Sequence, residues 1–217
     1  MPNKMLIIED ARADRERYRT LLESMPEHVA FAWAWDARGC SVMNWFRERC
    51  GSVDQFAAAG PGAALKSLLD GCGAMDPFEG FSLVLLDLAW SRPAEDAVRK
   101  LQFLRTADGT RLAEARISTR PGPPITPPSE TDAGYVGQYR RLSDRLEGIA
   151  LLDWLDDRQP GTRRPEVWVT STFVTTQARG LRQFLRVAYD RRPDRDLFHK
   201  WADEEPLAEA MKSFLRQ

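Results

Sequence analysis

The chain has 217 residues, of which 43% are hydrophobic and 29% charged, and its 31 basic and 32 acidic side chains leave a net charge of −1. That length suffices for one substantial core, or for one domain with large insertions. The charge balance argues against a nucleic-acid or anionic-membrane partner. No apolar run approaches the ~20 residues of a membrane span, and the N-terminus does not resemble a signal peptide.

The cysteines and histidines are few. Cys40, Cys50 and Cys72 are odd in number and lack C-x-x-C spacing, and His28 and His199 are the only histidines. These residues predict neither a disulfide framework nor a zinc site. We therefore expect a reduced, cytoplasmic protein.

The N-terminal part alternates between strand and helix patterns. Residues 4–10 predict a short apolar strand that ends in Glu9 and Asp10, residues 14–24 an amphipathic helix, and residues 28–35 a second strand. Large aromatic side chains at several predicted element positions are expected in the core: Trp33, Trp35, Trp154 and Trp168.

Residues 37–80 are harder to interpret. Residues 40–49 and 61–69 predict helices, and glycine-containing turns at 60–62 and 71–73 mark helix ends. A strand near 53–58 stays open as an alternative. The most strand-like run of the chain, residues 81–88, then ends in Asp87.

Residues 91–142 predict an insertion. They contain a short helix at 94–104, a turn at 108–109 and the proline-rich segment 120–128, which is extended or irregular because proline fixes φ and lacks a donor. After the insertion, helices and strands alternate again. The predicted elements are a helix at 142–157, a strand at 166–170, a helix at 175–189, a strand at 196–199 and a helix at 205–215.

Alternating strands and helices predict a parallel sheet with right-handed crossovers. The carboxyl ends of its strands meet at one edge, which brings together Glu9, Asp10, Asp87, Thr170 and Lys200. Three close carboxylates repel one another, so a hard divalent cation such as Mg²⁺ is expected beside them. An aspartate flanked by Mg²⁺ and a lysine has the chemistry of a phosphoryl acceptor.

These residues resemble the receiver domain of bacterial two-component response regulators. The resemblance covers roughly residues 4–35, 81–90 and 142–216. It is carried by Ile7-Ile8-Glu9-Asp10, Leu85-Leu86-Asp87-Leu88, the 165–171 strand that ends in Thr170-Ser171, and Lys200, with Gly148 leading a helix like the receiver's third.

The resemblance implies a fold and a set of roles. The fold would be one flavodoxin-like α/β domain over residues 1–217, a doubly wound five-stranded parallel sheet in the order 2-1-3-4-5 with helices on both faces and the insertion at 91–142. Asp87 would accept the phosphoryl group, Thr170 would be the switch hydroxyl and Lys200 would pair with the phosphate. Mg²⁺ would be bound by Glu9, Asp10, Asp87 and the backbone carbonyl of Ala89.

The implied function is a stand-alone signalling protein, not an enzyme with turnover. A histidine kinase or phosphotransfer protein would donate the phosphoryl group, and output would pass through contacts with another protein, a homodimer being left open. Three departures favour an alternative, a pseudo-receiver that acts without phosphorylation. Trp201 follows the lysine where receivers have proline, Leu197 replaces their switch aromatic, and the insertion leaves from the loop that bears Asp87 and would roof the site. A phosphohydrolase of the haloacid-dehalogenase type is disfavoured, since it needs an acid where Ala89 stands.

Overall fold

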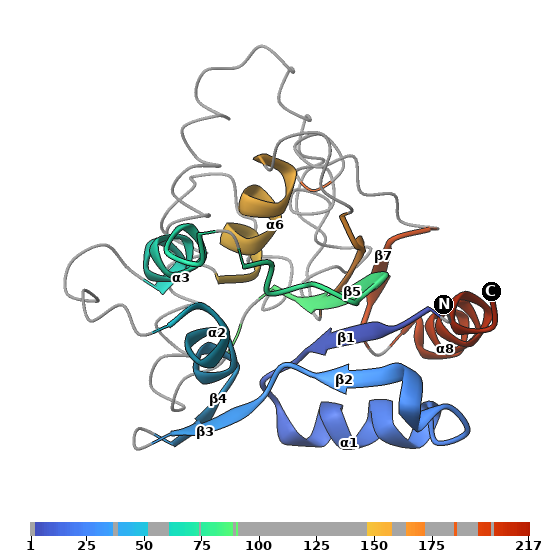
Figure 1. Ribbon diagram of the computed structural model, residues 1–217. Coiled ribbons are helices and arrows are strands. Elements are labelled where there is room, and N and C mark those ends of the chain that lie inside the picture. Colours follow the sequence, from blue (N-terminus) through green and yellow to red (C-terminus); the bar gives the residue numbers. More distant parts are fainter. Residues whose placement is uncertain are drawn as a thin grey trace, which may run out of the picture.

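The computed structural model describes a parallel sheet and the helices around it (Figure 1). The described residues are 3–36, 39–51, 61–73, 75–88, 90, 147–157, 164–171, 185, 195–200 and 202–217. Among the helices in these ranges, none has the length and apolarity needed to cross a membrane.

All five strands of the main sheet run parallel. They are β1 (Met5–Ile8), β2 (Val29–Phe31), β5 (Leu83–Asp87), β6 (Glu166–Ser171) and β7 (Leu197–His199), in the spatial order β2-β1-β5-β6-β7. The prediction of an α/β protein with a five-stranded parallel sheet is therefore confirmed. The chain numbering of the strands differs from the predicted 2-1-3-4-5 because a separate hairpin, β3 (Ala34–Asp36) and β4 (Gly39–Ser41), intervenes between β2 and β5.

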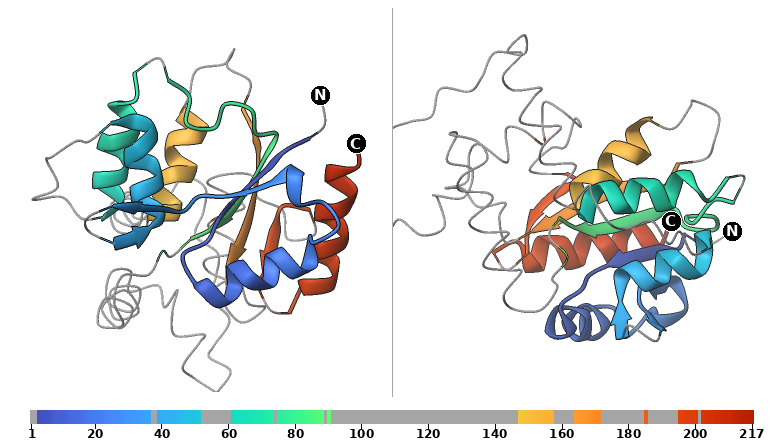
Figure 2. Two further views of the ribbon diagram at one scale, coloured as in Figure 1. Left: turned by 60° about the horizontal axis from the view of Figure 1, so that its bottom comes forward. Right: turned by 90° about the vertical axis from the view of Figure 1, so that its left-hand side faces the viewer.

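The two faces of the sheet pack against different helices (Figures 1 and 2). Successive side chains of a strand point to opposite faces. Met5, Ile7 and Leu85 pack with α1 (Arg12–Leu21) and α8 (Glu204–Leu215). Leu6, Ile8 and Leu86 pack on the other face, with α2 (Val42–Cys50), α3 (Pro61–Asp70) and α6 (Glu147–Asp157). Because both faces are covered, the central strands are apolar throughout, which explains their continuous aliphatic sequences.

The helix boundaries follow local signals. Ser41 caps α2 by accepting a hydrogen bond from the Asn44 amide at 3.0 Å, and Pro61 occupies the first turn of α3, where its missing N–H costs nothing. The predicted helices at 14–24, 40–49, 61–69 and 205–215 are confirmed, with ends that agree within three residues.

The strand predicted over residues 28–35 is only partly correct. The chain leaves the main sheet after Phe31, and residues 34–36 pair antiparallel with residues 39–41 in the hairpin. Trp35 consequently lies on the hairpin with 77% of its surface exposed, so its assignment to the core was wrong. Trp168 is buried, whereas Trp33 and Trp154 are half-buried and pack at the edge of the core.

Three predicted regions cannot be compared. The alternative strand at 53–58 and the elements of the insertion lie outside the described residues, as does most of the predicted helix at 175–189, of which only Leu185 is described, as a buried helical residue.

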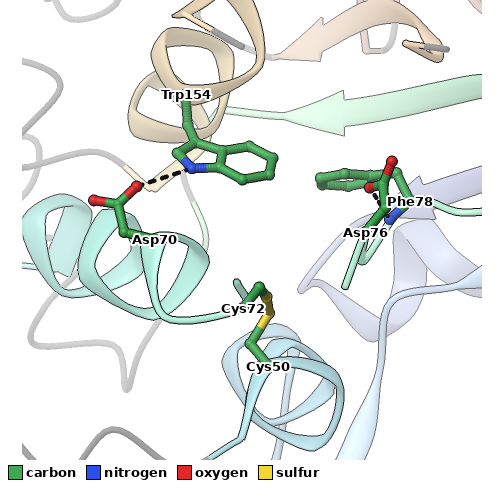
Figure 3. The surroundings of a disulfide bond; sticks show 6 residues. All are labelled: Cys50, Asp70, Cys72, Asp76, Phe78 and Trp154. Carbon is green, nitrogen blue, oxygen red and sulfur yellow. Dashed lines mark hydrogen bonds between the residues drawn. A yellow bond between two sulfur atoms is a disulfide. The ribbon is translucent and has the colours of Figure 1, made fainter. Parts of the chain in front are cut away.

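Cys50 and Cys72 form a disulfide that the sequence analysis did not predict (Figure 3). They lie just at or after the ends of α2 and α3, their Cα atoms are 4.3 Å apart and both side chains are buried. Cysteine spacing along the chain could not reveal this pair, because packing of the two helix ends brings the residues together. The prediction of no disulfide, made from an odd cysteine count, is corrected here.

We expect that replacing both residues (Cys50→Ala with Cys72→Ala) lowers the free energy of unfolding by about 2–4 kcal/mol under oxidising conditions. The reason is that the cross-link closes a loop and so lowers the conformational entropy of the unfolded chain. Urea denaturation measures this difference. A thiol reductant should lower the stability of the wild type by a similar amount and leave the double variant unchanged. Equal sensitivity of both proteins to reductant would contradict the pairing.

Candidate functional site

The alternation of side chains along the strands brings the polar residues onto one face. Asp87 follows Leu85 by two positions and Thr170 follows Trp168 by two, so both project from the face covered by α1 and α8. Asp87 and Thr170 are also register partners between β5 and β6. Chain folding therefore places an acid and a hydroxyl side by side at the carboxyl edge of the sheet.

Three carboxylates converge at this edge. One oxygen from each of Glu9, Asp10 and Asp87 lies within 4.8 Å of the other two. Glu9 and Asp87 are buried, and Asp10 is partly exposed. The structure thus brings together the acids that the sequence analysis had assigned to a metal site.

Lys200 is the cation at the centre of this cluster. Its ammonium nitrogen lies 2.6 Å from Glu9 Oε2, 3.0 Å from Asp14 Oδ2 and 3.5 Å from Asp87 Oδ1. The lysine itself is only 9% exposed. A buried ammonium needs such partners, since an unpaired charge in the interior is strongly destabilising.

Burial perturbs the ionisation of each group. It raises the pKa of Glu9 to about 8, and the negative charge of Asp87 adds to this effect while Lys200 opposes it. Burial likewise raises the pKa of Asp87 to about 7, against the opposing charge of Lys200 and with a contribution from Asp10. Burial alone lowers the pKa of Lys200, but Asp87, Glu9 and Asp14 outweigh it and raise that pKa above its usual value.

The donor set fits a hard cation. Carboxylate oxygens are the ligands that such ions prefer, and among the described residues the acids at this edge outnumber the ammonium of Lys200. Glu9 Oε1 accepts the Ala11 amide at 3.0 Å. Glu9 Oε2 lies 2.6 Å from the Lys200 ammonium, so this oxygen already faces a cationic group.

Thr170 lies at the site, and its hydroxyl contacts a side chain of α1. Its hydroxyl lies 3.1 Å from the Tyr18 hydroxyl, and both side chains are buried. Burial raises the pKa of Tyr18 above its usual value, so the phenol is neutral and can donate or accept in this pair.

Three residues of α1 belong to the site and were missed by the sequence analysis: Asp14, Arg15 and Tyr18. Asp14 and Tyr18 are four residues apart, so they share one helix face, and that face packs on the carboxyl edge of the sheet. The sequence contained a signal for them. Asp14 and Tyr18 are spaced four residues apart in line with the apolar Leu22, which places polar groups on the helix face that packs on the sheet.

Arg15 supports the loop after β1. Its guanidinium donates to the backbone carbonyl of Glu9 at 3.1 Å and to that of Asp10 at 2.5 Å. The same group lies 3.5 Å from the centroid of the Trp33 ring. Arg15 therefore fixes the backbone that carries the two acids, and its cation–π contact with Trp33 fixes the guanidinium in turn.

The loop after β5 is packed against α6. Trp90 is buried, stacks on Phe46 and donates its indole N–H to the Asp87 carbonyl at 2.8 Å. The Gly148 amide donates to the Leu88 carbonyl at 3.2 Å. Trp90 and Gly148 thus fix the backbone around Asp87.

The other predicted site features differ in where they lie. Ala89, Trp201 and the 91–142 insertion are outside the described residues. Leu197 is buried among the aliphatic residues of the opposite sheet face. The His199 ring accepts the Ala202 amide and the His199 amide donates to Asp203, so these contacts order the turn after β7.

Comparison with known proteins gave no match to a family model, a curated protein or a solved structure.

The raised carboxyl pKa values predict a pH-dependent stability. A carboxyl group with a raised folded-state pKa stabilises the fold while it is protonated, and this stabilisation is lost as the pH rises from the usual values near 4 through the folded values of about 7 and about 8. We expect the metal-free thermal midpoint to fall across that window. Glu9→Gln should flatten the fall, as followed by circular dichroism; an unchanged profile would contradict the assignment.

Gly148 predicts an unusual substitution effect. A Cβ there would lie 2.6 Å from the Asp87 carbonyl oxygen and 2.7 Å from that of Leu88. In an open helix Gly→Ala stabilises by about 1 kcal/mol. Here we expect Gly148→Ala to destabilise by about 1–3 kcal/mol through overpacking, measured by urea denaturation. Stabilisation would show that α6 does not press on the Asp87 loop.

Proposed function

We propose that this chain is a receiver-like signalling protein that accepts a phosphoryl group on Asp87 in the presence of Mg²⁺. The observation that carries the proposal is the convergence of Glu9, Asp10 and Asp87 within 4.8 Å, with Lys200 3.5 Å from Asp87. These residues come from the ends of three separate strands, β1, β5 and β7, and they meet at the carboxyl edge of the sheet.

The fold supports the proposal. Counting only the strands of the main sheet, the order is 2-1-3-4-5, because β5, β6 and β7 are then its third, fourth and fifth strands. We propose that this is the flavodoxin-like arrangement, in which function lies beyond the carboxyl ends of the strands. Asp87 is the last residue of the central strand of that sheet.

The chemistry follows from the charges. An Asp87 carboxylate oxygen would attack phosphorus of a phosphohistidine, forming an O–P bond while the N–P bond breaks and its electron pair returns to the imidazole. Lys200 lies where it can neutralise the phosphoryl oxygens, and Glu9, Asp10 and Asp87 are the side chains that would hold Mg²⁺. When bound, Mg²⁺ would supply charge stabilisation for the transferred group.

Buried carboxylates also explain a need for the cation. With the pKa of Asp87 raised to about 7, a part of the metal-free protein carries a neutral, non-nucleophilic Asp87 at neutral pH. A divalent cation beside Asp87 favours its ionised form. The donor protein would be a histidine kinase or phosphotransfer protein, and output would pass through contacts with another protein.

Incubation with a small phosphodonor such as phosphoramidate and Mg²⁺ should add the mass of one phosphoryl group to the intact protein. Asp87→Asn should abolish the addition, because the amide is not a nucleophile. Asp153→Asn is a matched control, since Asp153 pairs with Lys66 between α3 and α6, remote in the sequence from the acids. A wild type that stays unmodified, in the presence of Mg²⁺ and excess donor, would favour the pseudo-receiver alternative.

A further inference from the structure

We propose that Asp14 and Tyr18, two neighbouring side chains of α1, are positioning residues that restrain the phosphoryl transfer by holding Lys200 and Thr170. The inference rests on the proposed function, because Lys200 and Thr170 act on a phosphoryl group only if Asp87 accepts one. It adds a restraint that comes from α1, outside the strand ends that carry the other site residues.

The two residues form one buried face. Asp14 and Tyr18 are separated by one helical turn and are 6% and 4% exposed. Arg17, which lies between them in sequence, forms an ion pair with Glu204 of α8. Helix α1 is thereby tied to α8, and its polar face is fixed against the residues at the ends of β6 and β7.

Asp14 competes with Asp87 for the ammonium of Lys200. The nitrogen lies 3.0 Å from Asp14 and 3.5 Å from Asp87, so Asp14 has the shorter contact. Glu9, the third partner at 2.6 Å, is among the proposed cation ligands. In the cation-loaded protein, Asp14 would then be the principal competitor, drawing Lys200 toward α1 and away from the acceptor.

Tyr18 likewise competes with the phosphoryl group for the hydroxyl of Thr170. The 3.1 Å contact between the two hydroxyls lies entirely inside the protein. A Thr170 hydroxyl that donates to a phosphoryl oxygen on Asp87 has to give up this partner, or share it. Loss of a hydrogen bond between neutral groups corresponds to about threefold to tenfold in an equilibrium constant, so the pair opposes the phosphorylated state to a measurable degree.

Little space is available for the two side chains to relax. A cavity of about 10 Å³ between α1 and α8 is lined by Asp14, Arg17, Tyr18, Lys200 and Glu204, among others. That volume corresponds to about one water molecule and excludes a phosphodonor. Movement of Lys200 toward Asp87 therefore lengthens its contact with Asp14.

The test compares phosphorylation of the wild type, Asp14→Asn, Tyr18→Phe and the double variant, with phosphoramidate as donor and saturating Mg²⁺. Each substitution keeps the shape of the side chain and removes the charge or the hydroxyl. Two exposed positions on the same helix provide matched controls, Glu16→Gln for the carboxylate and Thr20→Val for the hydroxyl. Urea midpoints identify any variant that has lost its fold.

We expect Asp14→Asn to raise the maximal rate of Asp87 phosphorylation about tenfold, the factor that corresponds to one charge-assisted hydrogen bond. The donor concentration for half-maximal rate should stay unchanged, since Lys200 acts in the transfer and not in donor capture. Asp14→Glu, which keeps the charge, should remain slow. Tyr18→Phe should tighten the beryllofluoride–Mg²⁺ adduct about threefold to tenfold.

The outcomes separate this inference from the proposed function. If the wild type is phosphorylated on Asp87 and the variants are no faster and bind beryllofluoride no more tightly, the restraint is refuted and the function stands. If the wild type is phosphorylated on Asp87 and the variants are phosphorylated faster, both are supported. If no variant accepts a phosphoryl group although each is folded and binds Mg²⁺, the proposed function fails and the restraint fails with it.

If Asp14→Asn does not fold, Tyr18→Phe alone decides. Removal of one hydroxyl leaves the apolar packing of the ring intact, so its effect on the adduct reports the Thr170 contact directly. No change in adduct affinity with Tyr18→Phe would then refute the restraint.

Discussion

The structure depends on how several acids are buried around a single ammonium. Lys200 contacts Glu9, Asp14 and Asp87, from the loop after β1, from α1 and from β5. Bringing these charges out of water is unfavourable unless each finds a partner, and the repulsion among the acids remains even with Lys200 present. The cluster is therefore electrostatically unfavourable to the folded state at the carboxyl edge of the sheet. A divalent cation or a transferred phosphoryl group is the kind of ligand that can relieve it.

The rest of the chain makes this arrangement tolerable. Apolar residues fill both faces of the sheet directly beneath the cluster, and the backbone of each acid-bearing loop is held by a specific contact. Arg15 holds the carbonyls of Glu9 and Asp10, while Trp90 and Gly148 hold the loop of Asp87. Such support is what a preorganised site requires, because charges that must act on a ligand need fixed positions before it arrives.

Much of this could be predicted from the sequence, for physical reasons. A parallel strand buried on both faces is a continuous aliphatic run, so the point where a polar residue ends the run marks the edge of the sheet. That reasoning located Glu9, Asp10, Asp87, Thr170 and Lys200 without a structure. It could not reveal contacts made across elements by helix packing. Asp14 and Tyr18 are ordinary residues of an amphipathic helix until α1 is placed against the sheet.

The remaining errors have the same origin. The Cys50–Cys72 bond depends on two helix ends meeting, and the β3–β4 hairpin depends on the chain leaving the sheet at Ala32. An alternating aromatic pattern predicts a strand but does not say to which sheet it belongs. Trp35 fits the pattern of a buried strand residue and yet is exposed on the hairpin. Local pattern determines the type of element here, whereas tertiary pairing determines its neighbours.

The central claim is that Glu9, Asp10 and Asp87 hold a divalent cation beside a reactive aspartate. A crystal structure of the protein soaked with Mn²⁺, a substitute for Mg²⁺ that anomalous scattering can locate, tests it most directly. The account predicts one Mn²⁺ peak within coordination distance of these carboxylates, lost in Asp87→Asn. A peak elsewhere, or an intact cluster without the ion at saturating Mn²⁺, would contradict it.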